Sequence, residues 1–120
     1  PDGGASALVA ASIGRARALK MALLAERLPA TDAVAAGLIA ECYPDDGYAA
    51  AAEALVQRIA DGPVDALGST KAAINDATLT ELDAAFARER AGQLVLLGAD
   101  DFHEGARAFM EKRPAVYRNR

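Results

Sequence analysis

Apolar residues recur every three or four positions along most of the chain, which is the spacing of one face of an α-helix. Turn-forming residues separate these segments. The pattern predicts helices over 5–13, 15–26, 32–36, 48–60, 63–75 and 79–97, and a last helix that starts at Asp100 or Asp101 and ends before Pro114. The chain is therefore predicted to be mainly helical.

Residues that commonly start or stop helices mark the ends of these segments. Gly14, Gly37 and Gly98 each follow an apolar segment and can close it, and Pro29 prevents a helix from continuing. The run Thr78-Leu-Thr-Glu81 matches a capping box ahead of the longest segment. Thr31 can cap the short helix, and Asp100 or Asp101 the last one.

Residues 38–44, Leu-Ile-Ala-Glu-Cys-Tyr-Pro, form the only credible β-strand in the sequence, and the turn Asp45-Asp46-Gly47 follows them. One strand cannot make a sheet, because its backbone groups would have no partner. The segment is therefore expected either to pair with residues outside these 120 or to be merely extended.

Composition and charge place the chain among globular proteins and exclude several functions. It has 120 residues, of which 52% are hydrophobic and 25% charged, with a net charge of −4. The acidic balance argues against a nucleic-acid binder, and charges interrupt the apolar runs before they reach the length of a membrane span. No signal peptide is recognisable, so a cytoplasmic protein is expected. Alanine is the commonest residue, so a core made from these residues would need cover from another domain or subunit.

The chain has one cysteine and one histidine, which limits the chemistry available to it. Cys42 can form no disulfide within the chain and no cysteine-based metal cluster, and is expected to be a buried small apolar residue. His103 lies near the predicted start of the last helix, where a surface role is expected rather than catalysis. No metal site is predicted.

Five blocks occur in an order that is recognisable as a whole. They are Pro1-Asp-Gly-Gly-Ala-Ser, Gly14-Arg-Ala-Arg-Ala-Leu, Leu28-Pro-Ala-Thr-Asp-Ala-Val-Ala-Ala-Gly-Leu-Ile, Thr70-Lys-Ala-Ala-Ile-Asn and Asp101-Phe-His-Glu-Gly-Ala-Arg-Ala-Phe-Met-Glu-Lys-Arg. Together they resemble the C-terminal half of the enoyl-CoA hydratase/isomerase (crotonase) family. The resemblance implies an α/β (α+β) crotonase/ClpP-like spiral fold in the full protein, whose other half supplies the sheets and the oxyanion hole. It also implies that residues 1–62 end the core domain and that 63–120 form a helical trimerisation region.

The same resemblance implies a role for Asp2. Family members with an acid at this position tend to be isomerases or other non-hydratase variants that use it to move a proton or to attack the substrate, and a carboxylate beside an acyl group suits proton transfer. The alternative is that Asp2 only stabilises a turn or caps a helix, which an Asp before Gly-Gly commonly does. The two water-activating glutamates of hydratases lie upstream of the matched residues, so isomerase and hydratase both stay open.

Further positions match the family's substrate contacts. Phe109 and Lys112 match residues through which the last helix of a neighbouring subunit reaches the adenine and phosphate groups of CoA, and Lys112 follows Phe109 at a spacing that places both on one helical face. Ser6, Leu8 and Val9 are candidates for the acyl pocket, although their spacing suits ordinary packing equally well.

The expected function is that of an acyl-CoA enzyme, a double-bond isomerase or a hydratase in fatty-acid or related acyl-CoA metabolism, acting through an oxyanion-stabilised enolate. Its expected partners are the acyl-CoA substrate and copies of itself in a trimer or hexamer, with neither nucleic acid nor membrane. CoA belongs to the substrate, so no separate cofactor is expected. The alternative is a catalytically incomplete helical oligomerisation module. A helix-turn-helix reading of residues 15–39 is disfavoured by the acidic net charge.

Overall fold

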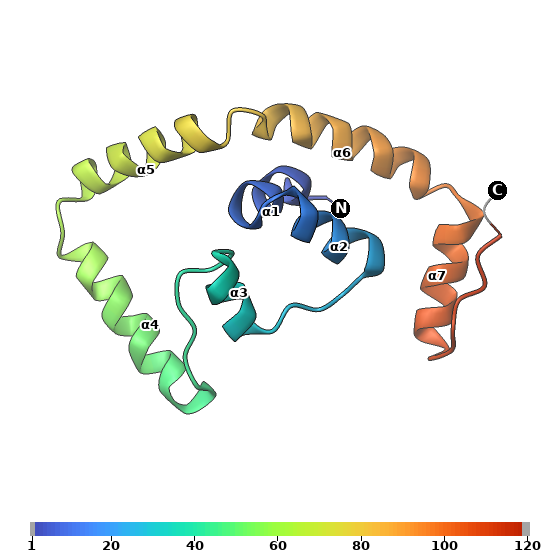
Figure 1. The fold of residues 1–120 in the computed structure, drawn as a ribbon, viewed down its shortest axis with the longest axis horizontal. Helices are drawn as coiled ribbons and strands as arrows, with labels where there is room; N and C mark the ends of the chain where they lie inside the picture. The colour runs from blue at the N-terminus through green and yellow to red at the C-terminus, as the bar shows by residue number, and fades with distance from the viewer. Residues whose placement is uncertain (1, 119–120) are drawn as a thin grey trace.

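A computed structural model describes residues 2–118, and all the regular secondary structure in that range is α-helical (Figure 1). The helices are α1 (Ala5–Ile13), α2 (Arg15–Leu24), α3 (Ala30–Ala36), α4 (Asp45–Ala60), α5 (Val64–Thr78), α6 (Leu82–Leu96) and α7 (Asp100–Met110). The prediction of a mainly helical chain is therefore confirmed.

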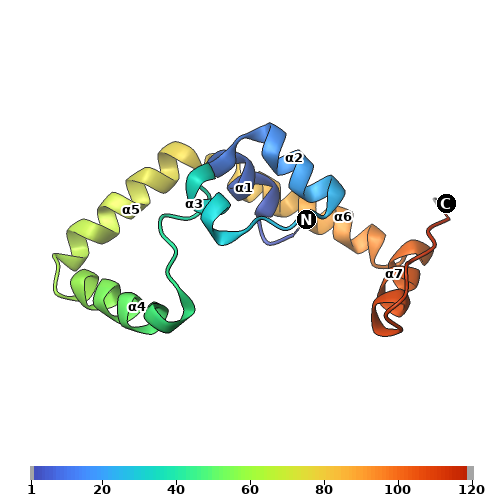
Figure 2. The ribbon, with the colours of Figure 1, turned by 60° about the horizontal axis from the view of Figure 1, so that its bottom comes forward.

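The helices form an open arc rather than a closed bundle. In Figure 1, α4, α5 and α6 follow one another along the outside, α1, α2 and α3 lie on the inner side, and α7 turns away at the end; Figure 2 shows the same arrangement from another angle. The radius of gyration is 18.6 Å, whereas a compact domain of this length would have about 14 Å. The main helix–helix packing joins α1 to α2 and α1 to α6.

The core within the described residues is small and made of alanine. Ala33, Ala85 and Ala108 are the buried apolar residues, and Glu89 is a buried charged one. Large apolar side chains such as Leu23, Val95 and Phe109 are instead 76%, 74% and 83% exposed. Exposing this much apolar surface to water is unfavourable in free energy. The expectation that the helices need cover from another domain or subunit agrees with this arrangement.

Two glycines end helices where the sequence indicates. Gly14 joins α1 to α2 with φ 80° and ψ 156°, a conformation that only glycine adopts without strain. Gly37 closes α3 with a left-handed φ of 80°, and the N–H groups of Gly37 and Leu38 donate back to the carbonyls of Val34 and Ala33. This pair of bonds is the Schellman arrangement.

The predicted side-chain caps are wrong. Thr78 is the last residue of α5, where its hydroxyl donates to the Ile74 carbonyl, and α6 begins only at Leu82. Thr31 lies inside α3, because Pro29 already supplies the extended entry that precedes this helix. Asp100 and Asp101 occupy the first turn of α7, where a carboxylate is favoured by the helix dipole without acting as a cap.

The predicted strand is also wrong. Residues 38–40 bend and 41–44 are irregular, since no neighbouring strand is present among residues 2–118 to pair with them. Cys42 is consequently exposed, not buried. The residues Asp45-Asp46-Gly47 form the first turn of α4 rather than a separate turn, and Pro44 precedes them as the N-cap residue with an extended ψ of 148°.

In the part of the chain that the structure describes, every helix is too short or too polar to cross a membrane. The cytoplasmic location stays a prediction.

Candidate functional site

Asp2 lies at the start of a tight turn that leads directly into α1. Its backbone carbonyl accepts a hydrogen bond of 3.0 Å from the Ala5 N–H, and the two residues between them, Gly3 and Gly4, have φ values of 63° and 82°. Such values are cheap only for glycine. The turn interpretation of Asp2 is thus confirmed for its backbone, whereas its exposed side chain makes no cap on α1. The carboxylate remains available to a ligand.

Glu89 on α6 holds this turn from the other side. One carboxylate oxygen, Oε2, accepts the Gly4 N–H at 2.7 Å, and the other, Oε1, accepts the Ser6 N–H at 2.8 Å. The residues are 85 and 83 positions apart in the sequence. Hydrogen bonds to an ionised carboxylate are short and strong, and these two satisfy N–H groups that the first turn of a helix leaves without partners.

The electrostatics of Glu89 agree with this geometry. Hydrogen bonding by Ser6, through its side chain and its N–H, lowers the pKa of Glu89 from its ordinary value, and the Gly4 N–H adds to the effect against the opposing effect of desolvation. Glu89 is therefore ionised at neutral pH. Its negative charge lies at the positive end of the α1 dipole.

The same face of α6 packs directly on the turn. A Cβ placed on Gly4 would lie 3.0 Å from Leu82 Cδ1 and 3.2 Å from Phe86 Cζ. Leu82, Phe86 and Glu89 are spaced so that they share one helical face. The turn at Asp2 is therefore fixed by backbone geometry, by packing and by a buried carboxylate together.

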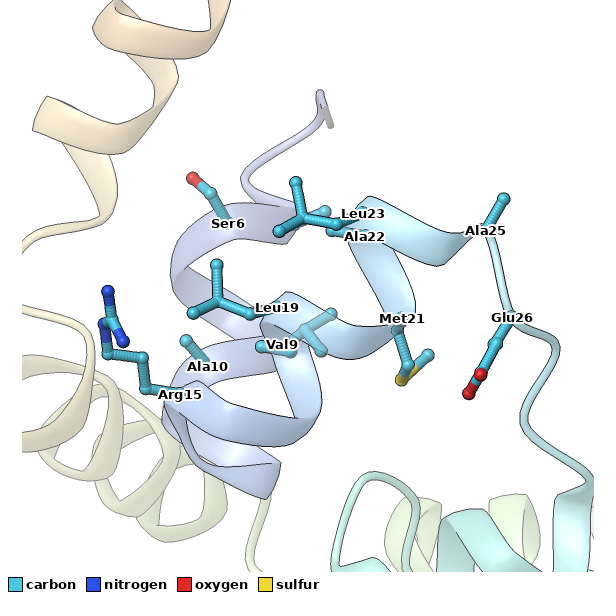
Figure 3. A pocket seen from close by; sticks show the side chains of 12 residues that line it. Ser6, Val9, Ala10, Arg15, Leu19, Met21, Ala22, Leu23, Ala25 and Glu26 are labelled. Atoms are coloured by element: carbon cyan, nitrogen blue, oxygen red, sulfur yellow. The ribbon is translucent and has the colours of Figure 1, made fainter.

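An apolar groove of about 780 Å³ lies between α1 and α2 (Figure 3). Ser6 and Val9 of α1 line the groove, together with Leu19, Met21 and Leu23 of α2. Figure 3 shows the charged side chains of Arg15 and Glu26 at its periphery, with Leu19 and Val9 between them. Its shape and lining suit a flexible hydrocarbon chain.

The predicted acyl-pocket residues are only partly brought together. Ser6 and Val9 line the α1–α2 groove, whereas Leu8 is absent from its walls and Asp2 precedes it on the turn. The α1 residues that line the groove are Ala5, Ser6, Val9 and Ala10, and at about 100° per residue position 8 falls on another side of the helix.

Phe109 and Lys112 lie on the distant arm formed by α7. Phe109 is 83% exposed. The prediction that the two share a helical face is wrong, because α7 ends at Met110 and Lys112 follows it with a left-handed φ of 53°. The Lys112 N–H donates to the Phe109 carbonyl, and the Arg113 N–H donates to the Ala108 carbonyl. This pair of bonds is again a Schellman end.

The segment after α7 is tied back to the helix by an ion pair. Arg113 donates to Glu104 from Nη1 at 2.6 Å and from Nη2 at 3.0 Å, and Glu104 Oε1 also accepts the Val116 N–H at 3.0 Å. The guanidinium, with the Val116 N–H, lowers the pKa of Glu104 to about 2. Arg113 also pairs with Glu111, so its charge is already engaged by two carboxylates.

His103 is exposed on α7 and contacts the Phe102 ring edge-on.

Glu89 is the residue that the sequence analysis missed. A signal was present, because Leu82, Ala85, Phe86 and Glu89 follow the i, i+3, i+4, i+7 spacing of a buried face, so that a charge stands where an apolar residue is expected. A carboxylate at such a position needs a partner. The sequence does not reveal that the partner is the backbone of residues 4–6.

The chain is similar to known proteins of one family. The family model for enoyl-CoA hydratase/isomerase matches residues 1–120. A solved enoyl-CoA hydratase from Mycobacterium avium subsp. paratuberculosis is 54% identical, with a TM-score of 0.97 over 99% of this chain and 48% of its own. A probable enoyl-CoA hydratase of Rhodobacter capsulatus is 37% identical over all of this chain and 47% of its own length. The 1,2-epoxyphenylacetyl-CoA isomerase of Escherichia coli is 37% identical over 94% of this chain and 43% of its own.

The chain spans about half the length of the curated relatives it matches. These shares measure length and not position, so they do not confirm that the matched part is the C-terminal half. The solved relatives have the crotonase fold, as the resemblance implied, and the residues described in this chain contribute helices to it. With the family model matching the whole chain, the protein belongs to the enoyl-CoA hydratase/isomerase family.

Proposed function

We propose that the whole protein acts on an acyl-CoA thioester as a double-bond isomerase or a hydratase, with Asp2 as its acid/base in isomerisation. The observation that carries the proposal is the Asp2 turn, which presents an exposed carboxyl group that is not used to cap α1, on a backbone fixed by Gly3, Gly4 and α6. Membership of the family, whose relatives are named for hydration and isomerisation of CoA esters, supports the substrate class.

A carboxylate in this position suits proton transfer along a short carbon chain. In a 3-enoyl-CoA, Asp2 takes a proton from C2, and the electrons of the C–H bond move into a dienolate with the charge on the thioester oxygen. The same carboxyl group then returns the proton to C4, and the double bond moves to C2–C3. The reaction needs no other reactant, because the proton removed is the proton returned. Hydrogen-bond donors to the thioester oxygen would come from residues outside this chain.

The other predicted contacts belong to the same proposal. The groove between α1 and α2, with Ser6 and Val9 in its walls, offers apolar lining for an acyl chain. Phe109 on α7 and Lys112 just after it would reach the CoA of a neighbouring subunit in a trimer or hexamer, which fits their exposure and the direction of α7 away from α1. CoA is part of the substrate, and no separate cofactor is required by this chemistry.

The role of Asp2 is tested by Asp2→Asn in the full-length protein. We expect isomerisation of 3-hexenoyl-CoA to fall by about 100-fold or more, which is the usual contribution of a general acid/base. Hydration of crotonyl-CoA, if the protein catalyses it, should be less affected. Asp76→Asn serves as the matched control, because Asp76 is an exposed carboxylate on α5. Unchanged isomerisation by Asp2→Asn contradicts the proposal.

The alternative is a helical oligomerisation module without catalysis, which the open arc and its exposed apolar side chains favour. Thermal unfolding of the full-length protein with and without acyl-CoA separates the two functions. Stabilisation by acyl-CoA that is lost in the double variant Phe109→Ala/Lys112→Ala supports a thioester site. Absence of any shift with acyl-CoA supports the module.

A further inference from the structure

We infer that Glu89 is a positioning residue for the Asp2 carboxyl group, acting through the backbone of residues 3–6. The inference rests on the proposed role of Asp2 as the acid/base. It starts from the burial of Glu89, which is 9% exposed and is the one charged residue classed as buried in residues 2–118, where the others are Gly4 and three alanines.

Both oxygens of Glu89 are used on the segment that carries Asp2. The Gly4 N–H donates to Oε2 at 2.7 Å, and the Ser6 N–H donates to Oε1 at 2.8 Å. Two bonds from one rigid carboxylate fix the orientation of the segment as well as its distance from α6. A single contact would leave the segment free to rotate about it.

The turn transmits this constraint to Asp2. Only Gly3 separates Asp2 from Gly4, and the bond from the Ala5 N–H to the Asp2 carbonyl closes the turn at 3.0 Å. Gly4 is buried against Leu82 and Phe86, so it cannot move toward α6 to relieve a lost bond. If Glu89 lost one of its bonds, the Gly3-Gly4 peptide could tilt and carry the Asp2 side chain with it.

Both oxygens of Glu89 accept N–H groups from the segment that carries Asp2, so we assign Glu89 no direct contact with the reacting atoms. Its effect on the reaction is therefore one of geometry. Displacement of a catalytic group by about an ångström can cost about 100-fold in rate.

The test is a double-variant cycle in the full-length protein, with Asp2→Asn, Glu89→Gln and the combination. Glu89→Gln keeps the size of the side chain but replaces one acceptor oxygen by an amide group that repels an N–H. We expect kcat for 3-hexenoyl-CoA isomerisation to fall about 10- to 100-fold, with KM changed by less than about twofold. The combination should be no slower than Asp2→Asn alone, because Glu89 acts only through Asp2. Glu53→Gln, an exposed glutamate on α4, is the matched control.

Each outcome decides a different point. Losses that multiply in the combination show that Glu89 acts independently of Asp2, and wild-type kcat in folded Glu89→Gln overturns the inference while leaving the proposed function intact. An unaffected Asp2→Asn overturns the proposed function and the inference with it. Should Glu89→Gln fail to fold, Glu89→Asp keeps the charge and withdraws it by one methylene; a lower kcat at constant KM is then expected, and an unchanged kcat contradicts the inference.

Discussion

At the scale of single residues, the two glycines of the Asp2 turn are both required by the backbone conformation of that turn. Gly3 and Gly4 both have positive φ, but their surroundings differ. A Cβ on Gly3 would meet nothing within 4 Å, whereas one on Gly4 would press against Leu82 and Phe86. A side chain at position 3 would therefore cost backbone strain alone, whereas one at position 4 would also disturb the packing against α6.

Gly3→Ala and Gly4→Ala should differ in stability for this reason. We expect Gly3→Ala to lower the free energy of unfolding by about 1–2 kcal/mol, the cost of a left-handed conformation for alanine. Gly4→Ala should cost about 1 kcal/mol more, because two packed side chains must also move. Urea unfolding of the full-length variants measures both values. Equal costs would show that α6 does not press on the turn.

At the scale of elements, an ion pair between a residue of α7 and a residue just beyond its end holds the following segment against the helix. Glu104 lies within the helix and Arg113 lies beyond its end, and the pair holds the following segment at Val116 against α7. Because the folded pKa of Glu104 is about 2 and its ordinary value is 4.5, ionised Glu104 stabilises the fold above pH 4.5. This stabilisation is lost as the pH falls from 4.5 toward 2.

Arg113→Ala should therefore destabilise the full-length protein in a pH-dependent way. We expect its melting temperature to lie below that of the wild type at pH 7, and the difference to shrink as the pH falls below 4.5, because the wild type then also loses the pair. Arg88→Ala is the matched control, since Arg88 forms an exposed pair with Glu81 at 3.7 Å and should contribute little at any pH. A gap in melting temperature that stays constant down to pH 3 contradicts the assignment.

At the scale of the whole molecule, the arc of helices is incomplete as a folded unit. Its buried apolar residues are alanines, while its larger side chains, such as Leu24, Leu94 and Met110, are mostly exposed. The radius of gyration of 18.6 Å exceeds that of a compact domain. The exposed apolar faces are therefore expected to be covered in the whole protein by its remaining residues or by other subunits.

A polypeptide of these 120 residues alone should reveal the uncovered faces. We expect it to bind an apolar dye strongly and to self-associate as its concentration rises, because burial of apolar area drives association. Dye fluorescence per mole and sedimentation velocity, compared with the full-length protein, measure the two effects. A monomeric chain with no more dye binding than the full-length protein would show that these helices close on themselves in solution.

The helical class, the positions of most helix ends and the family could all be predicted from the amino-acid sequence. Those features depend on local signals: apolar spacing, the glycines at 14 and 37, and motif order. The sequence patterns misjudged the caps, the strand at 38–44 and the burial of Cys42, since each depends on which neighbours are present. Only the tertiary structure showed that Glu89 binds the turn at Asp2 from more than 80 residues away. Periodicity marks a residue's face within its own helix, but the partner of a buried charge is set by the packing of distant segments.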